Sequence, residues 1–425
     1  MENQTIANPK PFLLQPSSYQ VWAQASARFL YQAGYGTIQF FIPLIFVNQL
    51  NFSATVVGIA IGCGALAGVV GHFLGGYLAD SPYYGRKRTL LFSALLSILA
   101  AIALTFLPNL SMLIVTNLLM GLSAGCYWTA ADAAVIDVTP PKEHQKAFAI
   151  LVLADSLGSG LGILSGGIIL SSVTQPQTLF LIAGLVLVVF LVTVLVAIAD
   201  SHQEANEHSD PLQGFSLALK DSSLQVFMLV NVLFTTYIAL VSTTLPLYFT
   251  NFVLTEISQT TSDAGSSLLS VTNLFTWCYV GIGSVLQLPL VQMLNSLLNV
   301  RVLSISMLLW VAGFVLVSAT HLMPSIILAG TIASFSVLSI ASTIYKPFAP
   351  ALIAELAPKS LRAVYLAIGY QCWSIGYFVG PIVGGWAMDR SPAIAHGLWI
   401  ATAISCFVGL FMLHILRLKK FAPVG

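Results

Sequence analysis

Four charged residues of this 425-residue chain lie inside long apolar stretches: Arg28, Asp132, Asp155 and Lys346. A charge in hydrocarbon costs about 3 kcal/mol even on lenient scales, so each needs a partner or a function. Partial burial raises the pKa of a carboxylate toward neutral pH, and a nearby cation that moves away changes its proton affinity. Asp132 and Asp155 are therefore the candidate proton carriers. Static ion pairing that only fixes the helices is the alternative.

Apolar stretches like these recur along nearly the whole chain. It is 57% hydrophobic and 7% charged with a mean hydropathy of +0.90, whereas about 25% of the residues in soluble domains are charged. Stretches of about 20 residues can cross a bilayer as helices. We predict an all-α membrane protein with helices near 21–48, 54–79, 88–107, 110–137, 147–170, 178–199, 223–250, 265–291, 301–319, 325–355, 363–388 and 397–417.

The basic residues predict how these helices are oriented. Twelve spans place both chain ends on one side, and only Arg390 falls on the other side, while Arg28 and Lys346 lie within spans. An excess of Lys and Arg marks cytoplasmic loops, so both termini are expected in the cytoplasm, and the short loops favour a bacterial inner (plasma) membrane. The basic residues on the terminal side are Lys10, Arg86, Lys87, Arg88, Lys142, Lys146, Lys220, Arg301, Lys359, Arg362, Arg417, Lys419 and Lys420.

The chain divides into two related halves of six spans. A shift of 218 residues aligns Asp137 with Glu355, Pro140 with Pro358 and a series of glycines. Internal duplication is how many transporters are built, with the solute site between the repeats. We expect two pseudo-symmetric six-helix bundles, with boundaries at 1–20 for a cytoplasmic tail, 21–199 for the first bundle, 200–222 for a cytoplasmic linker, 223–417 for the second bundle and 418–425 for a tail.

The loop between the second and third spans carries the most specific motif. Gly76 to Asp80 reads GYLAD, and Gly85 to Arg88 reads GRKR, with a turn two residues longer than usual and Ser81 at a position that is usually basic. This segment resembles the G-x-L-a-D-r-x-G-r-k signature of the major facilitator superfamily, and the resemblance covers essentially the whole chain. It implies a cytoplasmic latch that pairs with an acid ending helix 4 and engages helix 11, with Gly76 allowing close helix contact. The expected latch residues are Gly76, Asp80, Gly85, Arg86, Arg88, Asp137, Glu355 and Arg362.

Two glycine-rich spans resemble a second motif of the family, G-x-x-x-G-P-x-x-G-G, which is associated with antiporters. Ile163 replaces the proline in the fifth span, and Asn117 stands where antiporters usually carry arginine. The pattern is closest to the bacterial drug/proton antiporter-like branch, with these departures. Glycines four residues apart let helix backbones pack tightly. The expected packing residues are Gly158, Gly162, Gly166, Gly167, Gly376, Gly380, Pro381, Gly384 and Gly385.

In this family, helices 1, 4, 7 and 10 line a central cavity. The first span fits that role because Gln32, Tyr35 and Gln39 belong to one polar stripe at helical spacing. A polar seam bonded to neighbouring helices is the alternative interpretation of this stripe. The residues expected to line a solute cavity are Arg28, Tyr31, Gln32, Tyr35, Gln39, Trp128, Asn231, Thr235, Asn273, Trp277 and Lys346.

The resemblance implies a secondary transporter that works by alternating access. Proton-coupled efflux of a small organic solute is the first hypothesis, and uptake or exchange of an organic anion is the second, because Arg28 and Lys346 suit a carboxylate or phosphate. A channel would not need duplicated halves with a latch. A membrane-embedded enzyme would need a nucleophile or metal cluster within the spans, and no such spacing is found.

The expected partners follow from this hypothesis. They are a small solute, protons and membrane lipid, and the chain is expected to act as a monomer without cofactor, metal or nucleic acid. The sequence holds no phosphate-binding glycine loop with Lys-Ser/Thr, so no use of ATP is expected.

Overall fold

The computed structural model describes residues 16–81, 83–106, 109–140, 143–173, 175–199, 216–253, 270–322, 327–358 and 361–421. Twelve helices in this part of the chain are long and apolar enough to cross a membrane, so the predicted all-α membrane fold is confirmed. The elements are α1 (Pro16–Asn48), α2 (Ala54–Asp80), α3 (Gly85–Phe106), α4 (Leu110–Val138), α5 (His144–Ser172), α6 (Thr178–Ala197), α8 (Ser222–Tyr248), η2 (Phe249–Val253), η3 (Phe275–Gly281), α11 (Ile282–Leu294), α12 (Asn299–Thr320), α13 (Ile327–Leu356), α14 (Arg362–Met388) and α15 (Pro392–Phe421).

The helix ends differ from the predicted ones by a few residues. α1 begins at Pro16 and α15 continues through Phe421, so part of each expected tail is helical. Proline suits the first turn because its missing N–H is not needed there. The eighth span begins at Ser270 in the described residues, and most of the expected linker, 200–215, lies outside them.

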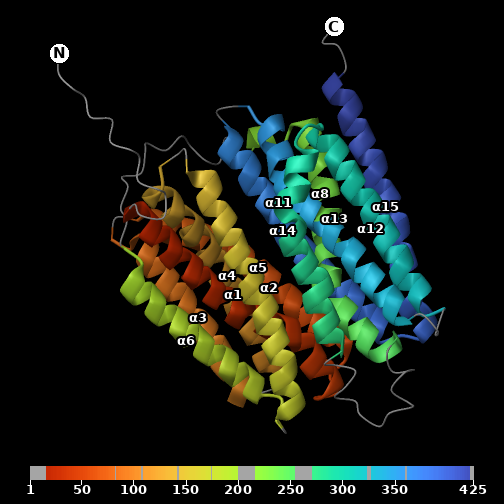
Figure 1. The fold of residues 1–425 in the computed structure, drawn as a ribbon, viewed down its shortest axis with the longest axis horizontal. Coiled ribbons are helices and arrows are strands. Elements are labelled where there is room, and N and C mark those ends of the chain that lie inside the picture. The colour runs from red at the N-terminus through yellow and green to blue at the C-terminus, as the bar shows by residue number, and fades with distance from the viewer. Residues whose placement is uncertain are drawn as a thin grey trace.

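The chain forms two bundles of helices that lie side by side (Figure 1). Helices α1 to α6 pack on one another in the first bundle, and α8 to α15 pack on one another in the second. The start of α1 and the end of α15 lie at the same end of the molecule (Figure 1). We call this end the terminal face, where α2, α4 and α13 end. The opposite end is the far face, where α1, α5 and α14 end.

Contact between the bundles is closest along α2 and α14, near the far face. A Cβ atom added to Gly58 would meet the carbonyl of Pro381, and one added to Gly385 would meet the carbonyl of Ala54. Only glycine therefore allows these two backbones to touch. The two halves are in backbone contact in the part of the membrane nearest the far face.

Toward the terminal face, one side of the same helix α2 is exposed. Nothing lies within 4 Å of a Cβ atom placed on Gly76, and the side chain of Phe73 is 60% exposed. The expectation that Gly76 allows close helix contact is thus corrected for this conformation. The neighbouring Gly75 has that role, because a Cβ there would meet Cys126 and Thr129 of α4.

Candidate functional site

The central feature of the first bundle is one arginine shared by two carboxylates. Arg28 on α1 donates from Nε to Oδ1 of Asp155 on α5 at 3.1 Å. Its Nη1 atom donates to Oδ1 of Asp132 on α4 at 3.0 Å. A single guanidinium group therefore joins α1 to α4 and α5, whose acids lie 104 and 127 residues further along the chain.

The charges of this cluster do not cancel within the first bundle. The Arg28 side chain is 6% exposed, Asp155 is 15% exposed and Asp132 is 37% exposed. Two acids face one cation, so with both acids ionised the cluster carries a net negative charge. The guanidinium also lies 4.8 Å from the centre of the Trp128 ring, a cation–π contact. Asp132 is the acid that water reaches most readily.

Lys346 of α13 supplies positive charge from the second bundle. It is exposed rather than buried, and it lies within electrostatic range of Asp155 without forming an ion pair with a described acid. Pro347 follows it directly, and Pro350 lies four residues after it in the same helix. Each proline lacks a backbone N–H, so the helix has two fewer hydrogen-bond donors just after this lysine.

The polar stripe of α1 divides between two environments. Gln32, Tyr35 and Gln39 are half-buried, and the Gln39 amide lies 3.5 Å from the Tyr35 hydroxyl. Tyr31 is fully buried, with its ring stacked 3.6 Å from that of Tyr127. The expectation that Tyr31 lines a cavity is therefore corrected: it packs between α1 and α4.

Asn231 and Thr235 are also buried, which corrects their predicted place on a cavity wall. Asn231 accepts a hydrogen bond from the Tyr345 hydroxyl at 2.6 Å and donates to the Gly369 carbonyl at 3.2 Å. Thr235 donates to the Cys372 carbonyl at 2.8 Å. In the second half, the polar-seam interpretation applies because these groups satisfy one another between α8, α13 and α14.

α14 carries a row of aromatic residues that sequence reasoning did not identify, and one of them lies near the cluster. Tyr370 is 52% exposed and lies within electrostatic range of Asp132 and Arg28. Trp373 and Tyr377 are half-buried and stack on each other at 6.1 Å. Tyr370, Trp373 and Tyr377 are spaced three and four residues apart, and this helical spacing was the sequence signal that could have identified them. Of the other expected cavity residues, Asn273 is half-buried and Trp277 is 67% exposed.

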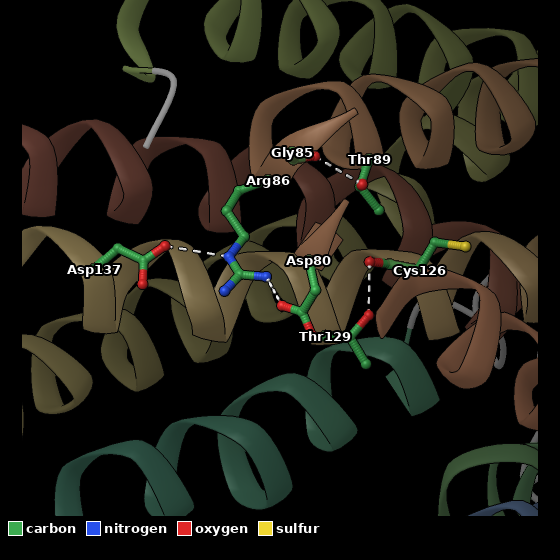
Figure 2. Close-up of polar contacts among 7 residues, drawn as sticks. All are labelled: Asp80, Gly85, Arg86, Thr89, Cys126, Thr129 and Asp137. Carbon is green, nitrogen blue, oxygen red and sulfur yellow. Dashed lines mark hydrogen bonds and ion pairs between the residues drawn. The ribbon is translucent and has the colours of Figure 1, made fainter. Parts of the chain in front are cut away.

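At the terminal face, the expected latch is assembled around Arg86 (Figure 2). Arg86 pairs with Asp80 at the end of α2, and its Nε donates to Asp137 at the end of α4 at 3.1 Å. Gly85 has a φ of 73°, a left-handed conformation that favours glycine, and this turn brings Arg86 between the two acids.

The other latch residues are placed less centrally. Arg88 donates to the carbonyl of Tyr83 within its own loop. Glu355, the counterpart of Asp137 in the second half, accepts a hydrogen bond from Asn299 at 3.2 Å. The side chain of Arg362 lies outside the described part of the structure.

In each half, the glycine motif brings one helix into close contact with a neighbouring helix. Gly158 and Gly162 of α5 pack on the carbonyls of Phe29 and Ala33 of α1. In the second half, Gly376, Gly380 and Gly384 pack on α8. Of the remaining motif residues, Gly166 packs on Phe41, Gly167 on Thr272 and Gly385 on Ala54, while Pro381 meets Gly58.

At the far face, a carboxylate of one half caps a helix of the other. Asp389, directly after α14, accepts hydrogen bonds from the Ala54 amide at 2.8 Å and the Thr55 amide at 2.7 Å, and also from the hydroxyl groups of Ser53 and Thr55. Partial burial alone would raise the pKa of Asp389, but these hydrogen bonds outweigh burial and lower it below its usual value. No sequence motif pointed to this residue.

The sequence of this chain matches that of a known protein family. The sequence profile described as Major Facilitator Superfamily matches residues 25–277, which is more than half of the chain. The chain belongs to the Major Facilitator Superfamily. The predicted family is thereby confirmed, and the protein is a multi-pass membrane transporter.

Several curated relatives of this major facilitator are transporters too. It is 22% identical over 415 residues to the Na(+), Li(+), K(+)/H(+) antiporter of Planococcus maritimus, covering 90% of this chain and 93% of that protein. It is 28% identical over 227 residues to the multi-drug resistance efflux pump PmrA of Streptococcus pneumoniae, covering 49% and 52%. A match to YfiG of Bacillus subtilis (strain 168) is 32% identical but spans 23% of this chain and 20% of that protein.

Solved structures share the fold of this major facilitator. The nucleoside transporter NupG superposes with a TM-score of 0.78 at 13% identity, covering 94% of this chain and 99% of that one. A peptide transporter POT in complex with sulfate superposes with a TM-score of 0.76 at 14% identity, covering 94% of each chain. At this level of identity the similarity establishes the arrangement of the helices alone.

Proposed function

We propose that this major facilitator exports a small organic solute in exchange for protons, with Asp132 and Asp155 as the proton-carrying groups. The observation that carries the proposal is the sharing of Arg28 by these two acids. One guanidinium cannot neutralise both carboxylates, so a proton on either acid removes the excess negative charge at low cost. Relatives named as an antiporter and as an efflux pump support exchange as the type of transport.

The terminal face is assigned to the cytoplasm in this proposal. In the topology predicted from the sequence, thirteen of the sixteen lysines and arginines fall on that side, and such a bias sets the orientation of membrane proteins. The exposed Lys346 and Tyr370 then face a cytoplasmic opening. In this proposal, the present conformation is the one that would load solute from inside the cell.

Alternating access would link the cluster to the solute. In the present state Lys346 is within electrostatic range of Asp155 but forms no ion pair with either acid, and closure of the terminal face would bring α13 toward α4 and α5. Lys346 would then compete with a proton for Asp132 or Asp155, because a nearby cation favours the ionised carboxylate. Protons would leave on one side of the cycle and be taken up on the other, while Gln32, Tyr35, Gln39 and Trp128 contact the solute.

The test is the luminal pH of proteoliposomes during solute addition under an imposed proton gradient. Proton movement opposite to solute movement is expected, and Asp132→Asn and Asp155→Asn should each abolish it. Asp221→Asn is the matched control, because Asp221 caps α8 and bonds to Tyr365 within the second half. Normal proton exchange in both cluster variants would refute the proton role, and proton movement along with the solute would establish symport instead.

A second candidate function is uptake or exchange of an organic anion. It rests on the exposed Lys346, a cation that is available to a carboxylate or phosphate in this conformation. The measurement is competition of transport by a panel of small organic anions. Competition that disappears in Lys346→Ala would favour this function over cationic or neutral drug export.

A further inference from the structure

A basic groove opens between α12 and α15 at the terminal face, on the side of the second bundle away from the first. It has a volume of about 390 Å³. In Figure 1 these two helices form the outer edge of the second bundle. We define this feature, the α12–α15 groove, by its lining residues Leu297, Arg301, Ser304, Ile305, Leu410, Leu413, His414 and Arg417.

The groove is built from one face of each helix. Arg301, Ser304 and Ile305 recur at three- and four-residue spacing on α12, and His414 with Arg417 does so on α15. Deeper along the pair, the helices close up, since Gly409 of α15 packs directly on Met307 of α12. The groove is thus a local widening at the end of a tight helix pair.

Its chemistry divides into a cationic part and an apolar part. Arg301 and Arg417 are exposed, and neither side chain forms an ion pair with a described residue. No acidic residue belongs to the lining. α12 also begins without a side-chain cap, so its first N–H groups add positive potential at the same place. An anionic group suits this end, while Leu297, Leu410 and Leu413 offer an apolar wall.

We propose that the α12–α15 groove binds an acidic phospholipid, with the phosphate between Arg301 and Arg417 and an acyl chain along the leucines. The position favours lipid because exposed apolar side chains such as Leu308, Phe407 and Phe411 continue from the groove along the same two helices. Basic pockets between membrane helices at a cytoplasmic surface recognise anionic headgroups. This site is separate from the central cluster, so it does not depend on the proposed function.

The test is native mass spectrometry of the full chain in detergent with three probes added separately. These are phosphatidylglycerol, phosphatidylcholine with the same acyl chains, and glycerol phosphate, which has the anion but no acyl chain. Phosphatidylglycerol is expected to bind at least about tenfold more tightly than phosphatidylcholine, and glycerol phosphate should not displace it at equal concentration. Equal binding of the two lipids would overturn the proposal, and displacement by glycerol phosphate would show a free-anion site.

Two single substitutions locate the binding. Arg301→Gln and Arg417→Gln should each weaken phosphatidylglycerol binding about fivefold, as expected for removal of one cation near a headgroup. Lys220→Gln removes an exposed cation from the same face outside the groove and should leave affinity unchanged. Both arginines are surface side chains, so helix content by circular dichroism should stay normal. Unchanged lipid affinity in both arginine variants would refute the site.

Discussion

The hydroxyl of Thr55 lies 2.5 Å from Oδ2 of Asp389, and this contact joins the two halves of the transporter at the far face. Thr55 is in the first turn of α2 and Asp389 directly follows α14. The unpaired N–H groups of a helix start attract a carboxylate. Because the contact joins the two halves, we expect it to stabilise this conformation over one in which the halves separate at the far face.

Replacing Asp389 by Asn should open the far face. An amide accepts fewer hydrogen bonds and turns N–H donors toward the donors of Ala54 and Thr55. Loss of a helix cap costs about 1 kcal/mol, which shifts the conformational equilibrium about fivefold. The measurement is the distance between spin labels at Gln49→Cys and Ser391→Cys, in a background without the five native cysteines.

The control for this experiment is Asp221→Asn. Asp221 also caps a helix, α8, but its partners Ser223 and Tyr365 lie in the same half. Its loss should destabilise the fold slightly without changing the label distance. An identical distance distribution in Asp389→Asn and the unsubstituted protein would contradict the role of Asp389 as a clamp.

Asp389 should not be a proton sensor at physiological pH. Its pKa is lowered in the closed state, so its stabilising effect is fully present above the usual carboxyl pKa and is lost only as pH falls through the lower folded value. The label distance at the far face should therefore not change through Asp389 between about pH 5 and pH 8. A pH-dependent opening in this range that disappears in Asp389→Asn would show that the pKa of Asp389 is not lowered in the closed state.

Removing Arg28 should damage the protein more than removing either acid. Arg28→Gln leaves two carboxylates without their cation, and breaking a buried ion pair in this way costs about 3 kcal/mol or more. Arg28→Gln/Asp155→Asn restores the original net charge and should recover much of the lost thermal stability in detergent. Failure of the double variant to recover any stability would indicate that the shape of Arg28, and not its charge, holds the helices.

Substitutions at the two ends of α2 should have different effects on the contact between the halves. Gly58→Ala places a methyl group against the Pro381 carbonyl and should open the far face, whereas Gly76→Ala meets nothing in this conformation. The far-face label distance should lengthen in the first variant and stay unchanged in the second. Equal distances in both would show that the contact between α2 and α14 adapts without separating the halves.

The sequence alone determined the features that depend on local composition. Apolar length predicted the twelve spans because a bilayer demands about 20 residues of helix, and the loop motif predicted the pairing of Asp80 with Arg86. Glycines at matching positions in the two halves predicted where backbones pack, as Gly158 and Gly376 do. Each of these signals can be recognised within a few helical turns.

The tertiary structure decided which side chains meet. Arg28 forms ion pairs with both Asp132 and Asp155. Asn231 and Thr235 lie in a buried seam, although their spacing on the helix resembles that of a cavity face. Asp389 accepts a hydrogen bond from Ser53, which is 336 residues away in sequence, and no motif predicts this contact. The reason is physical: helical periodicity is set by neighbouring residues, whereas the rotation and register of one helix against another result from all their packing contacts together.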